Sequence, residues 1–599
     1  MSFPRALLLL PTAALAFAAT PDGQDLYTKN CAACHETLSP LQNHVALKTM
    51  SPEYIMRVLN IGAMRVQAAK LTRDERAAVA EYLTGKAPEA APSGEVGRCP
   101  GAPSKSFAGP QWNGWGVDLE NTRFQPADAA GLTAQQVPRL KLKWAFGFPG
   151  DYSAYAQPAI AGGRVFVGSA AGLVYSLDAS SGCTYWSFQA ASGVRTGITI
   201  GPGDVAYFGD AHANVYAVDA NTGKLIWKTT VDEYPTARVT ASPKLYEGRL
   251  YMGVASRDEW LSVDPRFQCC KFRGSVVALD AKTGKQVWKT YTITEPAHPT
   301  SKTKAGTQLW GPSGVGVWTS PTIDTKRKVL YVGTGDSYSE PPTPMSDSIL
   351  ALDLSTGKIV WTKQITEGDV FNGNCLQAKP STCPINVGPD ADFGSSPILR
   401  TLPGGRSLLI AGQKSGVVHA LDPDKKGETV WETRVGKGGV LGGIQWGPSA
   451  DRETAYVALS DIGLIPAPEG VIPDPKAGGG LFAIQLSTGE KLWSVLPPPE
   501  GCKTPHCSPA QSAAVTAIPG VVFSGSMDGH LRAYDAKNGK ILWDYDTAKE
   551  YQTVNGVPGK GGSLDGPGPA VAGGLLVVNS GYAFFNGISG NVLLAFGVE

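Results

Sequence analysis

Short apolar runs separated by polar, glycine-rich turns cover most of this chain. Two examples are 163–168 (Gly-Arg-Val-Phe-Val-Gly) and 329–333 (Val-Leu-Tyr-Val-Gly). Runs of this length, rich in β-branched and aromatic residues and bounded by turn formers, predict β-strands. From residue 144 to the C-terminus the pattern predicts many short strands and no long helix.

A longer unit repeats within this region. It consists of a strand, an Asp-x-x-Thr-Gly-Lys turn and a second strand that carries a tryptophan. The copies lie at 177–186, 218–227, 279–288, 353–361, 422–431, 485–493 and 535–543. Trp144 precedes the first copy, and Leu594, Ala595 and Phe596 end the chain on an unmatched strand.

The spacing of the repeats predicts the fold class. The eight tryptophans lie 41 to 73 residues apart, which suits four-stranded blades and therefore an all-β, eight-bladed β-propeller. The spare strands at the two ends predict that the first and last strands share a blade. The repeated Asp, Gly and Trp residues are interpreted as turn and packing residues. The widest spacings, which follow Trp227, mark long loops where function is expected.

The first hundred residues follow a different pattern. Ser51-Pro52 is expected to begin a helix, and Thr72 with Glu75 forms a capping-box pattern before another. We therefore expect a small all-α domain over residues 19–86 and a linker rich in Pro, Ala and Gly over 87–106. The propeller is expected over 107–599. Residues 1–18 resemble a secretory signal peptide, with a membrane anchor as the alternative.

The motif Cys31-Ala-Ala-Cys34-His35 adds chemistry to the helical domain. Two thiols one helical turn apart, followed by histidine, are typical of covalent haem c attachment, with His35 as an iron ligand. A methionine is the usual sixth ligand in electron-transfer cytochromes. Met50, Met56 and Met64 are candidates; Met64 is preferred because it follows a glycine just ahead of the last helix.

Charge and cysteine content limit the kinds of partner and the cellular compartment that fit this chain. The 53 basic and 52 acidic residues give a net charge of +1, and no basic run interleaves with aromatic residues, which argues against nucleic acid as a partner. The eight cysteines outside the haem motif form an even set, typical of disulfides in an exported protein. The close pairs are 269/270, 375/383 and 502/507, and 99/183 is left over. Buried free thiols are the alternative.

The tryptophan repeats resemble those of the pyrroloquinoline quinone (PQQ)-dependent quinohaemoprotein alcohol dehydrogenases, which are eight-bladed propellers. The resemblance covers about residues 110–599. A cytochrome at the N-terminus, instead of the C-terminus, is similar to the branch of that family that oxidises polyvinyl alcohol. The loop segments 393–397 and 507–513 also resemble that branch.

The resemblance implies sites for PQQ and calcium in the long loops. Family positions that bind the cofactor match Arg195, Thr240, Ser256, Trp318 (under the quinone), Lys414 and Trp446. Glu259 matches a calcium ligand, and Asp336 stands where the family often has asparagine; oxygen ligands suit a hard cation. Each residue alone also fits a solvated charge or a packing role, but their co-occurrence in these loops favours function.

One assignment departs from the family pattern, and another requires a choice among three aspartates. The family stacks a disulfide between adjacent cysteines on PQQ, and Cys269-Cys270 is expected to do so, although the pair lies one repeat later than usual. For the base that accepts the alcohol proton, Asp390 and Asp392 match the family loop better than Asp369.

The expected function is a periplasmic PQQ-dependent dehydrogenase that contains one haem c and Ca²⁺. It would oxidise secondary alcohol groups of polyvinyl alcohol and pass electrons through its haem to an external cytochrome c or similar acceptor. A quinohaemoprotein for small alcohols or sugars, and a non-catalytic propeller scaffold, are the alternatives. No stable membrane insertion is expected.

Overall fold

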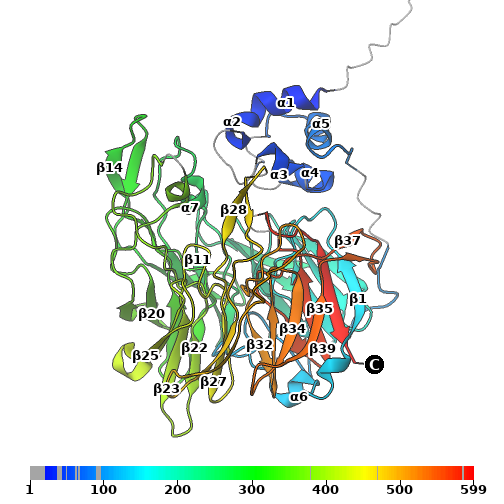
Figure 1. Cartoon of the computed structure of the whole chain (residues 1–599), viewed down its shortest axis with the longest axis vertical. Helices are drawn as coiled ribbons and strands as arrows, with labels where there is room; N and C mark the ends of the chain where they lie inside the picture. Colours follow the sequence, from blue (N-terminus) through cyan, green and yellow to red (C-terminus); the bar gives the residue numbers. More distant parts are fainter. Residues whose placement is uncertain are drawn as a thin grey trace, which may run out of the picture.

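A computed structural model describes residues 21–36, 43–48, 50–60, 64, 68–88, 96–104, 106–377, 380–468, 470–582 and 586–598. It divides into a small helical domain and a large β-propeller, with the helical domain seated on one end of the propeller (Figure 1). The expected signal peptide lies outside the described residues. Among the described residues, no helix is long and apolar enough to cross a membrane.

Among the residues that the structure describes, the helical domain packs five helices around a small apolar core. They are α1 (Gly23–Asn30), α2 (Ala32–His35), α3 (His44–Leu47), α4 (Pro52–Asn60) and α5 (Arg73–Thr84). The capping box before α5 is confirmed, because Glu75 N donates to Thr72 Oγ1 (3.2 Å) and Thr72 N donates to Glu75 Oε2 (2.7 Å). A Cβ on Gly23 would lie 2.1 Å from Ala78 O, so glycine permits α1 and α5 to cross closely.

Eight four-stranded sheets among the described residues confirm the predicted propeller. Seven are continuous in sequence: β2 (Ala159–Ala161), β3 (Arg164–Gly168), β4 (Leu173–Asp178), β5 (Thr184–Gln189); β6 (Thr199–Gly201), β7 (Val205–Gly209), β8 (Asn214–Asp219), β9 (Leu225–Thr230); β10 (Lys244–Tyr246), β11 (Arg249–Val254), β12 (Ser275–Asp280), β13 (Gln286–Tyr291); β17 (Thr322–Asp324), β18 (Val329–Gly333), β20 (Ser348–Asp353), β21 (Ile359–Gln364); β22 (Ile398–Thr401), β23 (Ser407–Gly412), β24 (Val417–Asp422), β25 (Glu428–Arg434); β26 (Ser449–Ala450), β27 (Thr454–Ala458), β30 (Leu481–Gln485), β31 (Lys491–Val495); and β32 (Thr516–Ile518), β33 (Val521–Gly525), β34 (His530–Asp535), β35 (Ile541–Asp546).

The eighth sheet closes the ring. It joins β1 (Lys141–Gly147) to β40 (Val592–Gly597), followed by β39 (Leu575–Ser580) and β38 (Ala570–Ala572). The antiparallel register pairs Lys141 with Gly597 and Gly147 with Val592. The prediction that the two ends of the propeller share a blade is therefore confirmed.

The repeated tryptophans dock each blade onto the next. Trp186 Nε1 donates to Ala220 O of the following blade (2.9 Å), and six further repeat tryptophans make the equivalent bond. A Cβ on Gly223, whose φ is +72°, would lie 2.7 Å from the Trp186 ring. The turn glycine thus serves both the turn and the packing of the preceding blade's tryptophan.

Insertions between the blade strands supply the remaining elements. They are the hairpins β14 (His298–Lys302) with β15 (Gln308–Gly311), β28 (Leu464–Ala467) with β29 (Gly470–Pro473) and β36 (Glu550–Tyr551) with β37 (Gly559–Lys560), the strand pair β16 (Ser313–Gly314) with β19 (Ser337–Ser339), and the short helices α7 (Asp258–Leu261), η3 (Gly373–Leu376) and η4 (Pro423–Lys425). Two more short helices, α6 (Ala127–Ala130) and η2 (Val137–Arg139), precede β1. In Figure 1, α7, β14, β28 and β37 lie toward the end of the propeller that carries the helical domain.

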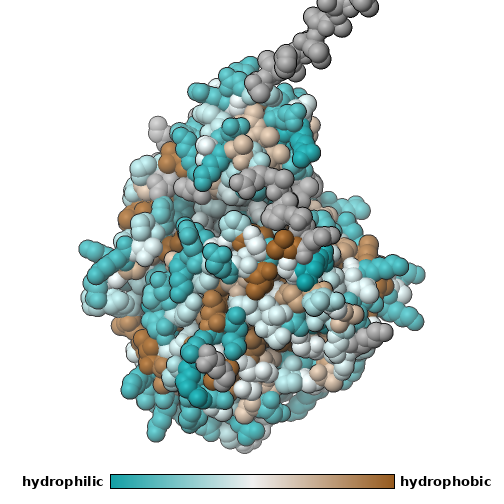
Figure 2. Space-filling view, turned by 90° about the vertical axis from the view of Figure 1, so that its right-hand side faces the viewer, coloured by the Kyte–Doolittle hydropathy of each residue, from teal (hydrophilic) through white to brown (hydrophobic). Residues whose placement is uncertain are grey.

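Four disulfides stabilise the long loops. They join Cys99 to Cys183, Cys269 to Cys270, Cys375 to Cys383 and Cys502 to Cys507, which are the predicted pairs. Bonds of this kind persist in oxidising compartments and support a location outside the cytoplasm. On the side shown in Figure 2, the helical domain forms a separate lobe, and apolar residues lie in small groups among hydrophilic ones.

Candidate functional site

A pocket of about 1000 Å³, counting the space at its mouth, lies among the inter-strand loops of the propeller. Nine residues predicted from sequence contribute to its lining: Arg195, Thr240, Ser256, Glu259, Trp318, Asp336, Asp392, Lys414 and Trp446. They come from five different blades or the loops that join them. The propeller therefore brings together residues as far apart in the chain as Arg195 and Trp446.

One wall of the pocket is cationic. The Arg195 guanidinium lies 4.1 Å from the centre of the Trp446 ring, and Arg238 is a second lining residue. Burial, together with the nearby charges of Arg257 and Arg195, lowers the pKa of Arg238 to about 10. The Nε of Arg238 is buried without a hydrogen-bond partner among the described residues. A buried guanidinium with unused donors suits a carboxylate ligand.

The opposite wall is acidic. One carboxylate oxygen each from Asp336, Asp390 and Asp392 lie within 4.8 Å of one another. Burial raises the pKa of Glu259 to about 7. The charge of Lys414 acts against this rise, and the charges of Asp392 and Asp369 add to it. Burial and the neighbouring carboxylates raise the pKa of Asp336 well above its usual value.

Lys414 partly balances these carboxylates. Its Nζ lies 2.7 Å from Asp390 Oδ1 and 3.0 Å from Asp392 Oδ2. Burial lowers the pKa of Lys414, but the charges of Asp390, Asp392 and Glu259 outweigh this effect and hold it well above its usual value. The lysine is therefore a permanent cation in this wall.

Trp318 lies between the two walls. A Cβ on Gly394 would lie 2.1 Å from Cη2 of Trp318, so the indole packs directly against the glycine backbone. Trp446 meets Trp318 edge-on, with ring centroids 6.3 Å apart at 82°. Trp446 Nε1 in turn donates to Asp565 Oδ1 (2.8 Å), which fixes its orientation. Two rigid aromatic rings at right angles can receive a flat ligand.

The three candidate bases have different positions. Asp392 lines the pocket and also accepts a hydrogen bond from Asp336 N (2.8 Å). Asp390 is not in the lining, and its backbone takes a positive φ of 57°. Asp369 accepts hydrogen bonds from the backbone amides of Asp390 (3.2 Å) and Ala391 (2.7 Å), which holds the loop that presents Asp392.

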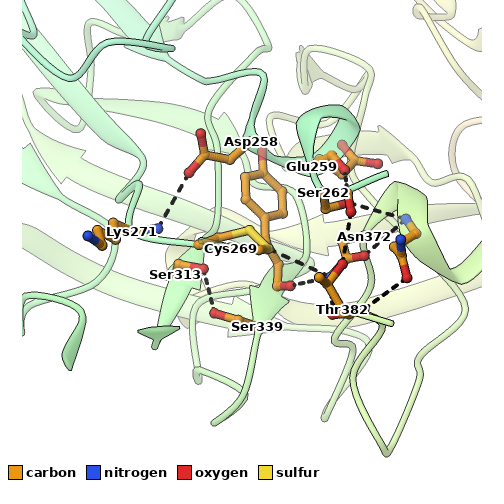
Figure 3. Close-up of a disulfide and its surroundings, with 12 residues drawn as sticks. Asp258, Glu259, Ser262, Cys269, Lys271, Ser313, Ser339, Asn372 and Thr382 are labelled. Carbon is orange, nitrogen blue, oxygen red and sulfur yellow. Dashed lines mark hydrogen bonds between the residues drawn. A yellow bond between two sulfur atoms is a disulfide. The ribbon is translucent and has the colours of Figure 1, made fainter. Parts of the chain in front are cut away.

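The adjacent cysteines lie beside the pocket. Cys269 and Cys270 are buried and do not belong to its lining, but they pack in the same apolar cluster as Tyr338, which does. Figure 3 shows Cys269 near Asn372, whose Nδ2 also donates to Tyr338 O (3.0 Å). The disulfide between Cys269 and Cys270 is confirmed, and its stacking on the quinone stays a prediction.

The haem motif lies on the first two helices of the helical domain. Cys31 N-caps α2, and His35 ends it. Cys31, Met50, Met56 and Met64 all pack against the same small core. Since the three methionines are equally placed against it, the choice of Met64 as iron ligand stays a prediction. The side chain of Cys34 lies outside the described part.

Several lining residues were not identified from the sequence. They are Arg238, Trp260, Tyr338, Gln445, Ser512, Asp565 and Tyr582. Arg238 lies two residues before Thr240 and could have been found from that spacing. Asp565 and Tyr582 follow the last full repeat, where no motif distinguishes them from loop residues.

The residues fit the cofactors that the sequence suggested. A planar tricarboxylate would meet Arg195, Arg238, Thr240 and Ser256 at its acidic groups and Trp318 at its face. The crowded carboxylates at the other wall suit a hard divalent cation, because mutual repulsion would fall once a cation is bound.

Comparisons with known proteins agree with this geometry. Residues 112–434 match the family model described as glucose/ethanol/alcohol dehydrogenase, beta-propeller domain. Residues 414–592 match a model described as outer membrane protein assembly factor BamB. Residues 18–83 match one described as cytochrome C oxidase, cbb3-type, subunit III.

Curated relatives cover both domains. A polyvinylalcohol dehydrogenase of Pseudomonas sp. is 41% identical over 99% of this chain and 96% of its own length. A second, from Sphingopyxis sp. (strain 113P3), is 38% identical over 96% and 93%. Among solved structures, the quinohemoprotein alcohol dehydrogenase of Comamonas testosteroni has a TM-score of 0.58 at 20% identity, covering 82% of this chain and 80% of that one.

Proposed function

The chain belongs to the family of PQQ-dependent quinohaemoprotein alcohol dehydrogenases, and we propose that it oxidises secondary hydroxyl groups of polyvinyl alcohol to ketones. The observation that carries the proposal is the similarity to two polyvinylalcohol dehydrogenases, which runs through both the helical domain and the propeller. The pocket supports it, since it joins a cationic wall, an aromatic floor and an acidic wall.

The residues of the pocket have separate roles in this proposal. Arg195, Arg238, Thr240 and Ser256 would bind the carboxylates of PQQ, and Trp318 would support its ring face. Glu259 and Asp336 would hold Ca²⁺ through oxygen ligands. When bound, PQQ accepts the two electrons that leave the alcohol.

Asp392 is the base in this proposal. It is the one candidate of the three that both lines the pocket and pairs with Lys414, so its carboxylate is placed to accept the hydroxyl proton of an alcohol bound there. Asp390 would hold Lys414, and Asp369 would hold the loop. The electrons would leave through haem c, bound by Cys31, Cys34 and His35 with Met64 as sixth ligand, to an external cytochrome c or similar acceptor in the periplasm.

The test is reconstitution. Protein that carries haem c but lacks quinone is mixed with PQQ and Ca²⁺, and polyvinyl alcohol is then added under anaerobic conditions. We expect the absorption bands of ferrous haem c to appear only when all three are present. If only small primary alcohols or sugars reduce the haem, the substrate is a small molecule and not the polymer. If no alcohol reduces the haem, the proposed dehydrogenase activity is rejected.

A further inference from the structure

The helical domain touches the propeller along helix α4. Arg57 Nη1 donates to Pro149 O (2.6 Å) in the loop between β1 and β2, and lies 3.7 Å from Asp151 Oδ1. One turn earlier on the helix, the Tyr54 ring lies 5.4 Å from the Tyr152 ring. Arg57 and Tyr54 therefore contact three residues of this loop, Pro149, Asp151 and Tyr152.

Asp151 makes this contact depend on charge. Its side chain is fully buried (0% exposed), and within 4 Å Arg57 is its one basic neighbour among the described residues. Burial raises the pKa of Asp151 to about 7, and the Arg57 charge acts against this rise. Removing one partner of a buried ion pair leaves the other uncompensated, which strongly disfavours the state that contains it.

The loop is shaped to receive α4. Gly150 has a φ of +65°, and a Cβ at this position would lie 3.2 Å from Arg57 Nη1 and 3.3 Å from Glu53 Cβ. A side chain here would push the helix away. Glycine thus serves both the turn and the close approach of the two domains.

A second contact lies apart from the first. Asn43 Nδ2, at the start of α3, donates to Pro468 O at the tip of the β28–β29 hairpin (3.0 Å). In Figure 1 this hairpin rises toward the helical domain. Two separate contact points fix the orientation of a domain, as well as its position.

The α4 contact adjoins the candidate pocket. Tyr155, in the same loop as Asp151, packs edge-on against Tyr582, which lines the pocket (ring centroids 5.7 Å apart). Arg257 follows the lining residue Ser256. Burial lowers the pKa of Arg257, and its neighbours Tyr54 and Tyr155 act against this fall. The docked helix therefore lies near the cationic wall.

We propose that Arg57 is a positioning residue that holds the helical domain in the docked arrangement from which electrons cross from the pocket to the haem. The proposal rests on the proposed function. Oxidation of one alcohol group releases two electrons and two protons. A single haem iron, reduced from ferric to ferrous, accepts one electron at a time, so the external acceptor must reoxidise it between the two transfers while the protons pass to solvent.

The experiment reverses the charge at this contact. Arg57→Glu sets a carboxylate against Asp151, whereas Arg57→Lys keeps the positive charge. Arg73→Glu, at an exposed position of α5, is the matched control. In the holoenzyme, haem reduction is followed by stopped-flow absorbance after addition of alcohol, and steady-state turnover is followed with a small dye that takes electrons directly from the propeller.

We expect Arg57→Glu to slow haem reduction at least about tenfold. Loss of one buried polar contact is enough to shift the docking equilibrium about tenfold, and the rate of haem reduction follows the docked fraction. Dye-linked turnover and KM should stay within about twofold of the unmodified protein, Arg57→Lys should restore most of the haem reduction rate, and Arg73→Glu should change neither. An equal fall of both rates in Arg57→Glu would place Arg57 in the pocket chemistry and overturn the proposal.

A second readout does not need turnover. Hydrogen exchange of residues 148–155 should become faster in Arg57→Glu than in Arg73→Glu, because undocking exposes that loop. Unchanged exchange would overturn the docking role. If the unmodified holoenzyme shows no haem reduction by any alcohol, the proposed function fails, while the exchange comparison still decides whether Arg57 docks the domain. Gly150→Val, which blocks α4 from the propeller side, should reproduce the Arg57→Glu result.

Discussion

At the scale of single residues, Lys414 sets the charge balance of the pocket. Lys414 is buried (7% exposed), and its ammonium group faces the carboxylates of Asp390, Asp392 and Glu259, with Asp336 close to them. One lysine compensates only one of these four carboxylates when all are ionised, and a divalent ion would compensate two of the other three. The arrangement explains why a lysine and a proposed cation site lie together.

The assignment of the base makes a direct prediction. Asp392→Asn keeps the shape of the side chain but removes the proton acceptor, and should lower kcat by roughly 10²–10⁴-fold with little change in PQQ binding. Asp128→Asn, on the exposed surface of α6, is the control. Steady-state kinetics and fluorescence titration with PQQ measure the two effects. A larger loss in Asp390→Asn than in Asp392→Asn would transfer the role to Asp390.

Cation binding should depend on pH. In the absence of a cation, the pKa of Glu259 is raised from 4.5 to about 7, so the folded protein holds a proton that the unfolded chain has lost. This group therefore lowers the stability of the cation-free protein as pH rises from about 4.5 to 7. Because Ca²⁺ must displace that proton, its affinity should increase roughly tenfold per pH unit up to about pH 7 and then level off.

Calorimetric titration of cation-free protein with Ca²⁺ at several pH values measures this dependence. Each binding event should release a proton below about pH 7, which appears as a dependence of the measured heat on the buffer. Glu259→Gln should flatten the pH dependence. A Ca²⁺ affinity independent of pH in the unmodified protein would remove Glu259 from the ligand set.

Short sequence segments predicted many of the residues that line the pocket, but not all of them. Arg195, Glu259 and Lys414 could be found because each lies in a short loop segment that resembles a family motif. Arg238 was missed although it lies only two residues before Thr240. Tyr582 was missed because it lies in no such segment, and its approach to the pocket depends on blades far apart in sequence. A local pattern reports on neighbours along the chain and not on residues that only the closed ring brings together.

At the scale of elements, the unit of stability is the contact between blades. The Trp186 ring is buried (5% exposed), donates a hydrogen bond to the next blade and rests on the glycine of that blade's turn. The same arrangement recurs around the ring, so each blade is fixed by its neighbours. This is why the Asp, Gly and Trp of the repeat carry structure and no chemistry.

A substitution series at this tryptophan separates packing from hydrogen bonding. Trp186→Ala should lower the stability by about 3–5 kcal/mol through the lost burial and the cavity. Trp186→Phe keeps most of the ring and should cost about 1 kcal/mol for the lost hydrogen bond, plus a smaller packing loss. Thermal unfolding, followed by the circular dichroism signal of the strands, measures both. Equal losses in the two variants would contradict the packing role.

The blades were predictable from the sequence because each repeats one pattern. The inserted elements were not. The hairpin β28–β29 and the helix α7 each occur once, and their sequences have no periodicity that distinguishes them from loops. The sequence located the insertions through the wide tryptophan spacings but could not show that they meet at one end of the propeller.

At the scale of the whole molecule, the segment before the first blade closes the ring from within. Arg123 is fully buried and donates to the carbonyl oxygens of Val515, Trp115 and Pro567, which lie far apart in the chain. Its guanidinium also lies over the Trp112 ring (5.2 Å). These contacts join separate blades, so the segment before β1 fills part of the hub with buried protein side chains.

The shared blade has a consequence for the order of assembly. Strand β1 (Lys141–Gly147) has no partner within its sheet until β40 (Val592–Gly597) arrives, and the two lie at opposite ends of the propeller sequence. A nascent chain therefore completes the ring of blades only when β40 has been made. A ligand at the centre of the propeller must therefore either enter after the ring has closed or be enclosed when β40 pairs with β1.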